Sequence, residues 1–214
     1  QGFGNAGYHF ARLAKQVGFN IVALSDSKGG IFSNDGLDPE RIMNHKKNRH
    51  ELKAMLYCDS SVCEEADYET IDNEELLELD VDILVLAALE NQISENNVSN
   101  VKAKVILEIA NGPVNGKADE ILYNNNTTVI PDVLANAGGV IVSYLEWVQN
   151  QTGLYWEEDE VNERLKNRLI KEAETIFRLA NEKSVSLRTA AYIHGVSRIA
   201  GAIKEKGTRE YFQG

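Results

Sequence analysis

Three glycines at the start of the chain have the spacing of a dinucleotide-binding turn. Gly2, Gly4 and Gly7 form a G-x-G-x-x-G run. In such a turn the first glycine makes the tight bend after a strand, and the second lets the backbone approach a pyrophosphate. The third lets the next helix pack on the sheet. Because glycine-rich turns are common, the alternative is an ordinary turn in an α/β domain.

The residues after the run have the order that such a turn needs. Apolar residues recur at helical spacing over 6–17, and Gly18 is placed to end that helix. Residues 19–24 form an apolar run typical of a buried strand, followed by Asp26. An acidic side chain at this distance holds the adenosine ribose in NAD enzymes. Only Gln1 precedes Gly2, so we expect a longer protein, cut at or within the central strand of its sheet.

Composition excludes several classes of protein. A net charge of −11 argues against nucleic acid as a partner, because phosphate neutralisation needs a basic face. No apolar stretch approaches the roughly 20 residues of a membrane span. Cys58 and Cys63 are too few for a disulfide framework, and with His45 and His50 they match no standard metal-site spacing. We therefore expect a cytoplasmic protein without a metal site.

Strands and helices alternate along most of the chain. Residues 27–36 are rich in turn formers and predict a surface loop or a small hairpin. Further strands are predicted over 68–71, 82–88, 104–109 and 127–130, with helices over 72–79, where Asp72 can be the cap, over 116–124 and from about 136 onward. This alternation predicts an α/β fold with a doubly wound, Rossmann-like, mostly parallel sheet whose first strand is largely missing. C-terminal helices follow. We expect a dinucleotide-binding domain over 1–150 and a helical segment over 151–214.

Four segments resemble the cofactor-binding half of glutamate dehydrogenase. They are 22–31, 108–113, 130–140 and 142–150, and the resemblance continues into the helical tail around 189–192. Its most specific parts are Asn-Gly-Pro at 111–113 and Asn-Ala-Gly-Gly-Val at 136–140. The resemblance places the catalytic lysine and aspartate on the other, amino-terminal domain, so it implies no catalytic residue in this chain.

The resemblance implies roles for eleven residues. The residues implied to bind cofactor are Gly2, Gly4, Asn5 and Ala6 at the pyrophosphate, Asp26 at the ribose, Ala87 and Ala88 nearby, and Asn111 and Asn136 at the nicotinamide end. Ser143 and Val140 would bind the glutamate substrate. The alternatives are that both asparagines are turn residues and that Ser143 bonds its own helix.

The implied activity is oxidative deamination of L-glutamate to 2-oxoglutarate and ammonia. Asp26 favours NAD because it would repel a 2′-phosphate, whereas Lys28 could offset that repulsion and admit NADP. The resemblance also implies a hexameric parent, and we expect the piece alone to bind cofactor without turnover. Two alternatives are a dehydrogenase of branched-chain or aromatic amino acids and a non-catalytic dinucleotide-binding module.

Overall fold

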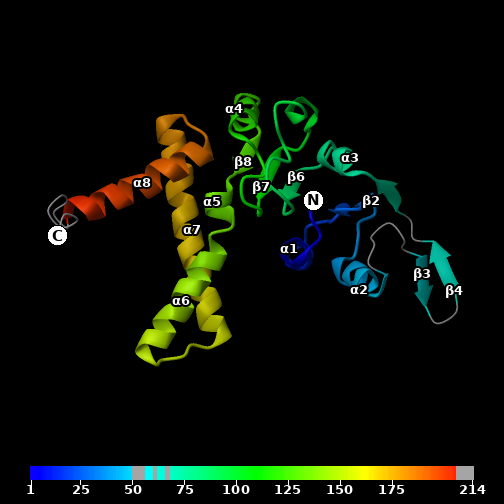
Figure 1. The fold of residues 1–214 in the computed structure, drawn as a ribbon, viewed down its shortest axis with the longest axis horizontal. Helices are drawn as coiled ribbons and strands as arrows, with labels where there is room; N and C mark the ends of the chain where they lie inside the picture. The colour runs from blue at the N-terminus through cyan, green and yellow to red at the C-terminus, as the bar shows by residue number, and fades with distance from the viewer. Residues whose placement is uncertain (50–55, 60–61, 66–67, 206–214) are drawn as a thin grey trace. The chain divides into compact units, whose positions relative to one another are not determined.

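The computed structural model describes residues 1–49, 56–59, 62–65 and 68–205 (Figure 1). The chain divides into two compact units, Gln1–Thr127 and Thr128–Gly214. The first unit contains, in order, α1 (Asn5–Gln16), β1 (Ala23–Asp26), β2 (Gly29–Phe32), α2 (Pro39–Arg49), β3 (Leu56–Asp59), β4 (Val62–Glu65), β5 (Glu69–Ile71), α3 (Asn73–Leu77), β6 (Ile83–Leu86), the 3-10 helix η1 (Val98–Asn100), β7 (Val105–Glu108) and α4 (Gly116–Asn124). The second contains β8 (Thr128–Ile130), α5 (Asp132–Ala135), α6 (Gly138–Thr152), α7 (Glu158–Lys183) and α8 (Leu187–Glu205). The functional division predicted at residue 150 stays a prediction.

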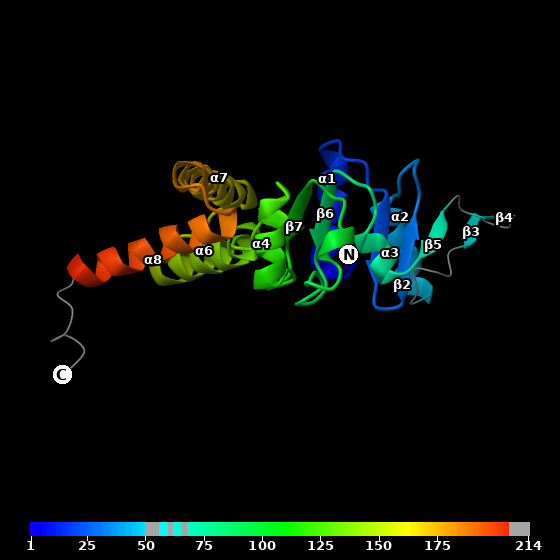
Figure 2. The same ribbon diagram turned by 90° about the horizontal axis from the view of Figure 1, so that it is seen from above.

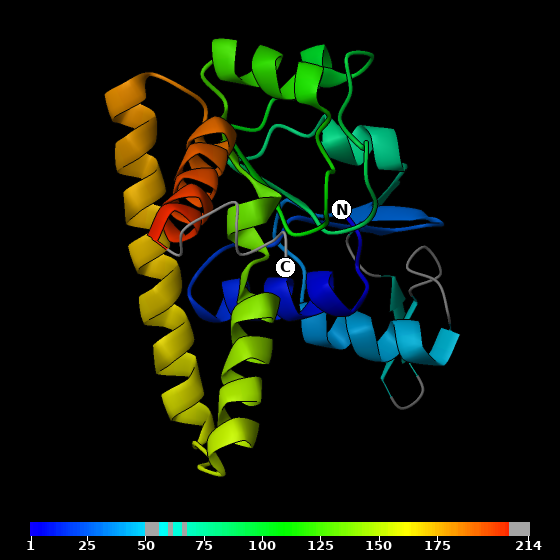
Figure 3. The same cartoon turned by 60° about the vertical axis from the view of Figure 1, so that its left-hand side comes forward.

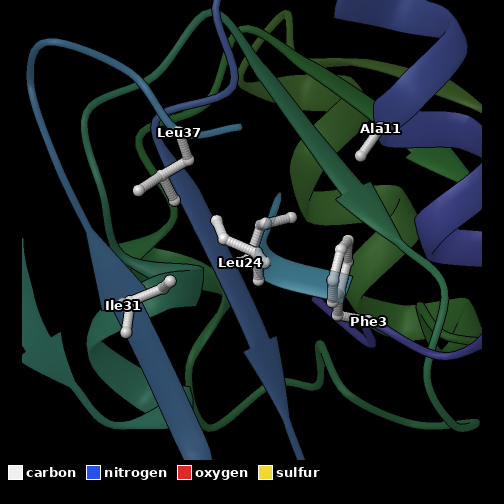
Figure 4. Close-up of a cluster of buried hydrophobic side chains, with 6 residues drawn as sticks. Phe3, Ala11, Leu24, Ile31 and Leu37 are labelled. Carbon is white, nitrogen blue, oxygen red and sulfur yellow. The ribbon is translucent and has the colours of Figure 1, made fainter. Parts of the chain in front are cut away.

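One apolar cluster joins the glycine run to the first hairpin. Leu24 of β1 and Ile31 of β2 are register partners, so their side chains share one face of the strand pair. Phe3 and Ala11 pack against them, together with Ile42 of α2 (Figure 4). Helices α1 and α2 therefore cover this face, and burial of Phe3 fixes the chain that leads into α1.

Strands β1, β2 and β5 pair antiparallel, and the prediction of a mostly parallel sheet is wrong for them. β1 pairs with β2, and β2 pairs with β5. Only Ser27 and Lys28 separate β1 from β2, and Gly29 has a φ of +128°. A two-residue connection can close a hairpin, whereas a parallel crossover needs a dozen or more residues. Residues 19–22, expected in a strand, precede the start of β1.

Strands β6 and β7 form the predicted parallel pair (Figure 2). Leu86 of β6 and Ile106 of β7 are fully buried. Helix α4 occupies the predicted span, and α3 follows Asp72 with a complete capping box that includes Glu75. The α/β class of the prediction is confirmed, as are the helices after β8.

The second unit is mainly helical. Figure 3 shows α6 and α7 side by side, with α8 against α7. The turn after α6 uses Gly153 at a φ of +68°, and three acidic residues occupy the first turn of α7. The apolar core of the second unit consists of Leu134, Ile176, Ala180, Ala190 and Ala191. Within the described residues, no helix combines the length and hydropathy that crossing a membrane requires.

Candidate functional site

The first glycine of the run lies against the backbone that follows β6. Gly2 has a φ of +87°, and a Cβ on it would stand 2.6 Å from the carbonyl carbon of Ala87 and from the nitrogen of Ala88. Its N–H donates to the carbonyl of Ser25 in β1 at 3.0 Å. Any side chain here would collide with backbone atoms. The turn therefore brings three predicted site residues, Gly2, Ala87 and Ala88, into direct contact.

The other two glycines differ in what surrounds them. A Cβ on Gly7 would overlap the carbonyl oxygen of Gly2, so α1 approaches the turn as closely as a glycine allows. A Cβ on Gly4 would meet no heavy atom within 4 Å. These are the roles expected for the third and second glycines of a dinucleotide-binding turn.

The start of α1 is suited to an anion. Gly4 is the N-cap residue and supplies no side-chain hydrogen bond to the helix. Gly4, Asn5 and Ala6 are exposed, and the first turn of the helix contains no acidic residue. The first backbone N–H groups of a helix have no acceptor within the helix, and the macrodipole adds partial positive charge there. This surface can therefore hold a phosphate group through backbone N–H donors.

Asp26 ends β1 with both carboxylate oxygens engaged. Its Oδ1 accepts from the backbone N–H of Lys28 at 2.9 Å, and its Oδ2 lies 2.9 Å from Nζ of Lys46 in α2. The same Nζ donates to the carbonyl oxygen of Phe3 at 2.8 Å. Only 11% of the Asp26 side chain and 23% of the Lys46 side chain are exposed. Lys46 thus joins the predicted ribose-binding carboxylate to the glycine turn, a role that the sequence did not reveal.

The loops after β6 and β7 lie at the same end of the parallel pair. The register places Leu86 beside Glu108, and the N–H groups of Ile109 and Ala110 both donate to the Leu86 carbonyl at 2.9 Å. Ala87 and Ala88 follow the first strand, and Asn111 follows the second. In open α/β sheets, ligands bind beyond the carboxyl ends of the strands. Asn111 therefore shares this end of the first unit with the glycine turn.

Three predicted residues belong to the second unit. Asn136 is the C-cap residue of α5, and its N–H donates to the Asp132 carbonyl at 2.9 Å. Val140 and Ser143 lie in the first two turns of α6, three positions apart and thus on one face of the helix. Both are exposed, Val140 with 76% of its surface accessible. The hydroxyl of Ser143 is available for a polar ligand on this face.

Metal ligands do not cluster in the described part of the chain: no three His, Cys, Asp or Glu side chains there are arranged to hold an ion. Cys58 and Cys63 are register partners in the β3–β4 hairpin, but their side chains lie outside the described set. His50 also lies outside the described residues.

Comparisons with known proteins agree on one family. The family model for Glutamate/Leucine/Phenylalanine/Valine dehydrogenase matches residues 1–207. An NADP-specific glutamate dehydrogenase of Synechocystis is 49% identical over 100% of this chain and 50% of its own length. A cryptic catabolic NAD-specific glutamate dehydrogenase of Bacillus subtilis is 42% identical over 97% of this chain and 46% of its own.

A solved structure supports the same relationship. The hetero-hexameric glutamate dehydrogenase of Thermus thermophilus, in its Leu-bound form, superimposes with a TM-score of 0.84 at 29% identity. The match covers 98% of this chain and 47% of that one. The chain thus spans about half the length of the curated relatives it matches.

Proposed function

Because the chain belongs to the Glutamate/Leucine/Phenylalanine/Valine dehydrogenase family, we propose that it is the NAD(P)-binding half of a glutamate dehydrogenase. The observation that carries this proposal is the glycine turn. Gly2 and Gly7 permit close backbone contacts. The Cβ position of Gly4 is empty, and no side chain caps the start of α1. That arrangement fits a nucleotide diphosphate, and the relatives that match over the whole chain are named glutamate dehydrogenases.

The proposed cofactor site follows the turn and the strand ends. Backbone N–H groups at the start of α1 hold the pyrophosphate, and the carboxylate of Asp26 accepts from the adenosine ribose. The carboxamide of the nicotinamide is oriented by asparagine side chains, whose amides both donate and accept hydrogen bonds. The residues of the first unit assigned to the cofactor are Gly2, Gly4, Asn5, Ala6, Asp26, Ala87, Ala88 and Asn111. Asn136, in the second unit, is proposed as a cofactor contact of its own.

The site is proposed to prefer NAD and to accept NADP. Asp26 alone would repel a 2′-phosphate, but its Oδ2 is paired with Nζ of Lys46 at 2.9 Å. This ion pair reduces the negative charge that a phosphate would meet. Relatives named NADP-specific and NAD-specific match the chain at 49% and 42% identity.

The proposed reaction is oxidative deamination of L-glutamate to 2-oxoglutarate and ammonia. The nicotinamide, when bound, supplies the acceptor for hydride. Ser143 donates a hydrogen bond to the side-chain carboxylate of glutamate, and Val140 lines the same pocket. A hydroxyl suits a carboxylate better than an apolar side chain, which favours glutamate over branched-chain or aromatic amino acids. Proton transfers are assigned to groups outside this chain.

The remaining partners are the other half of the polypeptide and further copies of it. The nitrogen of Gln1 donates to the Val85 carbonyl at 2.8 Å, and the carbonyl of Gln1 accepts from Ala87 at 2.9 Å. Bonds to Val85 of β6 and to Ala87, which follows β6, have the pattern of a parallel ladder. We place the end of a first strand at Gln1, giving a Rossmann-like sheet. A cytoplasmic hexamer of the whole polypeptide completes the proposal, in line with the hetero-hexameric relative.

A turnover assay tests whether the catalytic groups lie outside this chain. The 214-residue chain is incubated with glutamate and NAD or NADP, and cofactor reduction is followed by absorbance. We expect no sustained reduction by this chain and clear reduction by a polypeptide that also carries the other half. Sustained turnover by the chain alone would show that it contains catalytic groups and would refute the assignment.

A further inference from the structure

The loops that follow β6 and β7 are joined by backbone hydrogen bonds. The N–H of Asn91 donates to the Gly112 carbonyl at 2.8 Å. The N–H groups of Gln92 and Ile93 both donate to the Pro113 carbonyl, at 2.7 and 2.9 Å. One of these loops follows Ala87 and Ala88, and the other contains Asn111. The two loops therefore form one connected layer.

The side chain of Gln92 links this layer to the residue before the glycine turn. Its Oε1 accepts from Nε2 of Gln1 at 2.6 Å, and its Nε2 donates to the Glu90 carbonyl at 3.0 Å. The Nε2 of Gln1 also donates to Oδ1 of Asn73 at 2.8 Å. The backbone carbonyl of Gln92 accepts from Nδ2 of Asn97 at 2.8 Å. Gln92 is thus bonded through its side chain to Gln1 and through its backbone to the Asn-Gly-Pro loop.

We propose that Gln92 is a positioning residue for the nicotinamide end of the dinucleotide. Its amide keeps the loops that carry Ala87, Ala88 and Asn111 in register with the glycine turn. The inference rests on the proposed function, because it assigns these loops to the cofactor. Gln92 acts through Gln1 and Pro113.

The position of these bonds predicts which part of the ligand is affected. Pro113 is two residues from Asn111, whereas the side-chain hydrogen bonds of Gln92 join it to Gln1 and Glu90 and not to Asp26 or to the start of α1. Loss of the amide loosens the loops of the nicotinamide end and leaves the adenosine and pyrophosphate contacts in place. A site whose loops are already ordered binds its ligand more tightly, because less conformational entropy is lost on binding. NADH affinity should therefore fall more than ADP affinity.

The test compares NADH with ADP by calorimetric titration of the whole chain. The Gln92→Leu variant removes both side-chain hydrogen bonds at similar volume. We expect NADH affinity to fall about tenfold and ADP affinity to stay within about twofold of the unsubstituted chain. Gln151→Leu, at an exposed position of α6, is the matched control and should change neither value.

A second variant keeps the proposal falsifiable if Gln92→Leu does not fold. Gln1→Leu removes the other partner of the 2.6 Å bond and should give the same selective loss. When both single variants fold, the loss of NADH affinity in the double variant should be smaller than the sum of the single losses, because both variants break the bond between Gln1 and Gln92. Each variant also removes one hydrogen bond of its own, to Asn73 or to the Glu90 carbonyl. Equal losses for NADH and ADP, or no loss of NADH, overturn the positioning role. Failure of the unsubstituted chain to bind ADP or NADH overturns the proposed function instead.

Discussion

At the residue scale, Gly4 gives the sharpest test of the phosphate site. Its φ of −92° is open to any L-residue, and its Cβ position is empty, so Gly4→Val should fold normally. The branched side chain would occupy the space above the start of α1. We expect NADH affinity to fall at least tenfold, roughly 1.4 kcal/mol, in a calorimetric titration.

Gly116→Val is the matched control for that substitution. Gly116 begins α4, and a Cβ there also meets no heavy atom within 4 Å. Its NADH affinity should equal that of the unsubstituted chain. If Gly4→Val binds NADH as tightly as this control, the pyrophosphate does not lie over α1.

Lys46 provides a second residue-level prediction. Lys46→Gln removes the ion pair with Asp26 and leaves a carboxylate that is only 11% exposed without its lysine. We expect NADPH affinity to fall about tenfold relative to NADH, because the uncompensated carboxylate repels the 2′-phosphate. Fluorescence titration with both cofactors measures the ratio.

Lys104→Gln serves as the control, because the ion pair of Lys104 with Asp82 is exposed and lies elsewhere. It should leave the NADPH-to-NADH ratio unchanged. If Lys46→Gln lowers the affinity for NADH and NADPH equally, Lys46 does not influence the choice between the two cofactors.

Part of the candidate site was predictable from the sequence and part was not. The spacing of the glycines and the position of Asp26 follow from local rules for a turn, a helix and a strand. The contact of Lys46 with Asp26 joins residues 20 positions apart. It depends on how α2 packs beside α1, and no local pattern encodes that packing. The same holds for Gln92 and Gln1, which lie 91 positions apart.

At the element scale, the α7–α8 pair carries a pH-dependent contact. The two carboxylate oxygens of Glu172 lie 2.7 Å from Nε2 of His194 and 3.0 Å from Nη1 of Arg198. Burial alone would raise the pKa of Glu172, but the hydrogen bond with His194 and the charges of Arg198 and Arg168 outweigh it. The pKa therefore lies below its usual value.

The lowered pKa of Glu172 determines how the stability of the fold should change with pH. A carboxyl with a lowered pKa in the folded chain stabilises the fold above its unfolded pKa of about 4.3 and loses that contribution as the pH falls. Glu172→Gln should lower the free energy of unfolding by about 1–2 kcal/mol at pH 7. The difference from the unsubstituted chain should shrink below about pH 4. Urea unfolding at several pH values measures it.

Glu182→Gln is the control for this series, because the ion pair of Glu182 with Arg178 lies within α7 and is exposed. It should cost about 0.5 kcal/mol or less. If Glu172→Gln costs no more than this, or if its cost does not change with pH, the contacts of Glu172 with His194 and Arg198 do not stabilise the fold.

Helices were predicted more accurately than strand pairing. α4 has the span predicted for it, and Asp72 caps α3 as predicted. The cap of α4, Asn115, was not predicted. The turn formers over 27–36 predict a surface loop or a small hairpin, and β2, which lies in this segment, forms a hairpin with β1. The antiparallel pairing of β2 with β5 was not predicted. Strand direction depends on the length of the connection, and Ser27 and Lys28 alone are too short a connection for a parallel crossover.

At the scale of the whole molecule, the chain carries the proposed cofactor contacts of a longer enzyme. It spans about half of each curated relative described above, and the residues assigned to the pyrophosphate and ribose all lie in the first unit. Under the proposed function, this chain binds the coenzyme and groups outside it carry out the proton transfers. Coenzyme binding by this chain is therefore the central claim.

Calorimetric titration of the unsubstituted chain with NADH tests that claim most directly. We predict saturable binding of one NADH per chain, with displacement by excess ADP because both ligands share the pyrophosphate site at α1. Absence of binding heat for both NADH and NADPH, from a chain whose circular dichroism shows the α/β fold, would contradict the account.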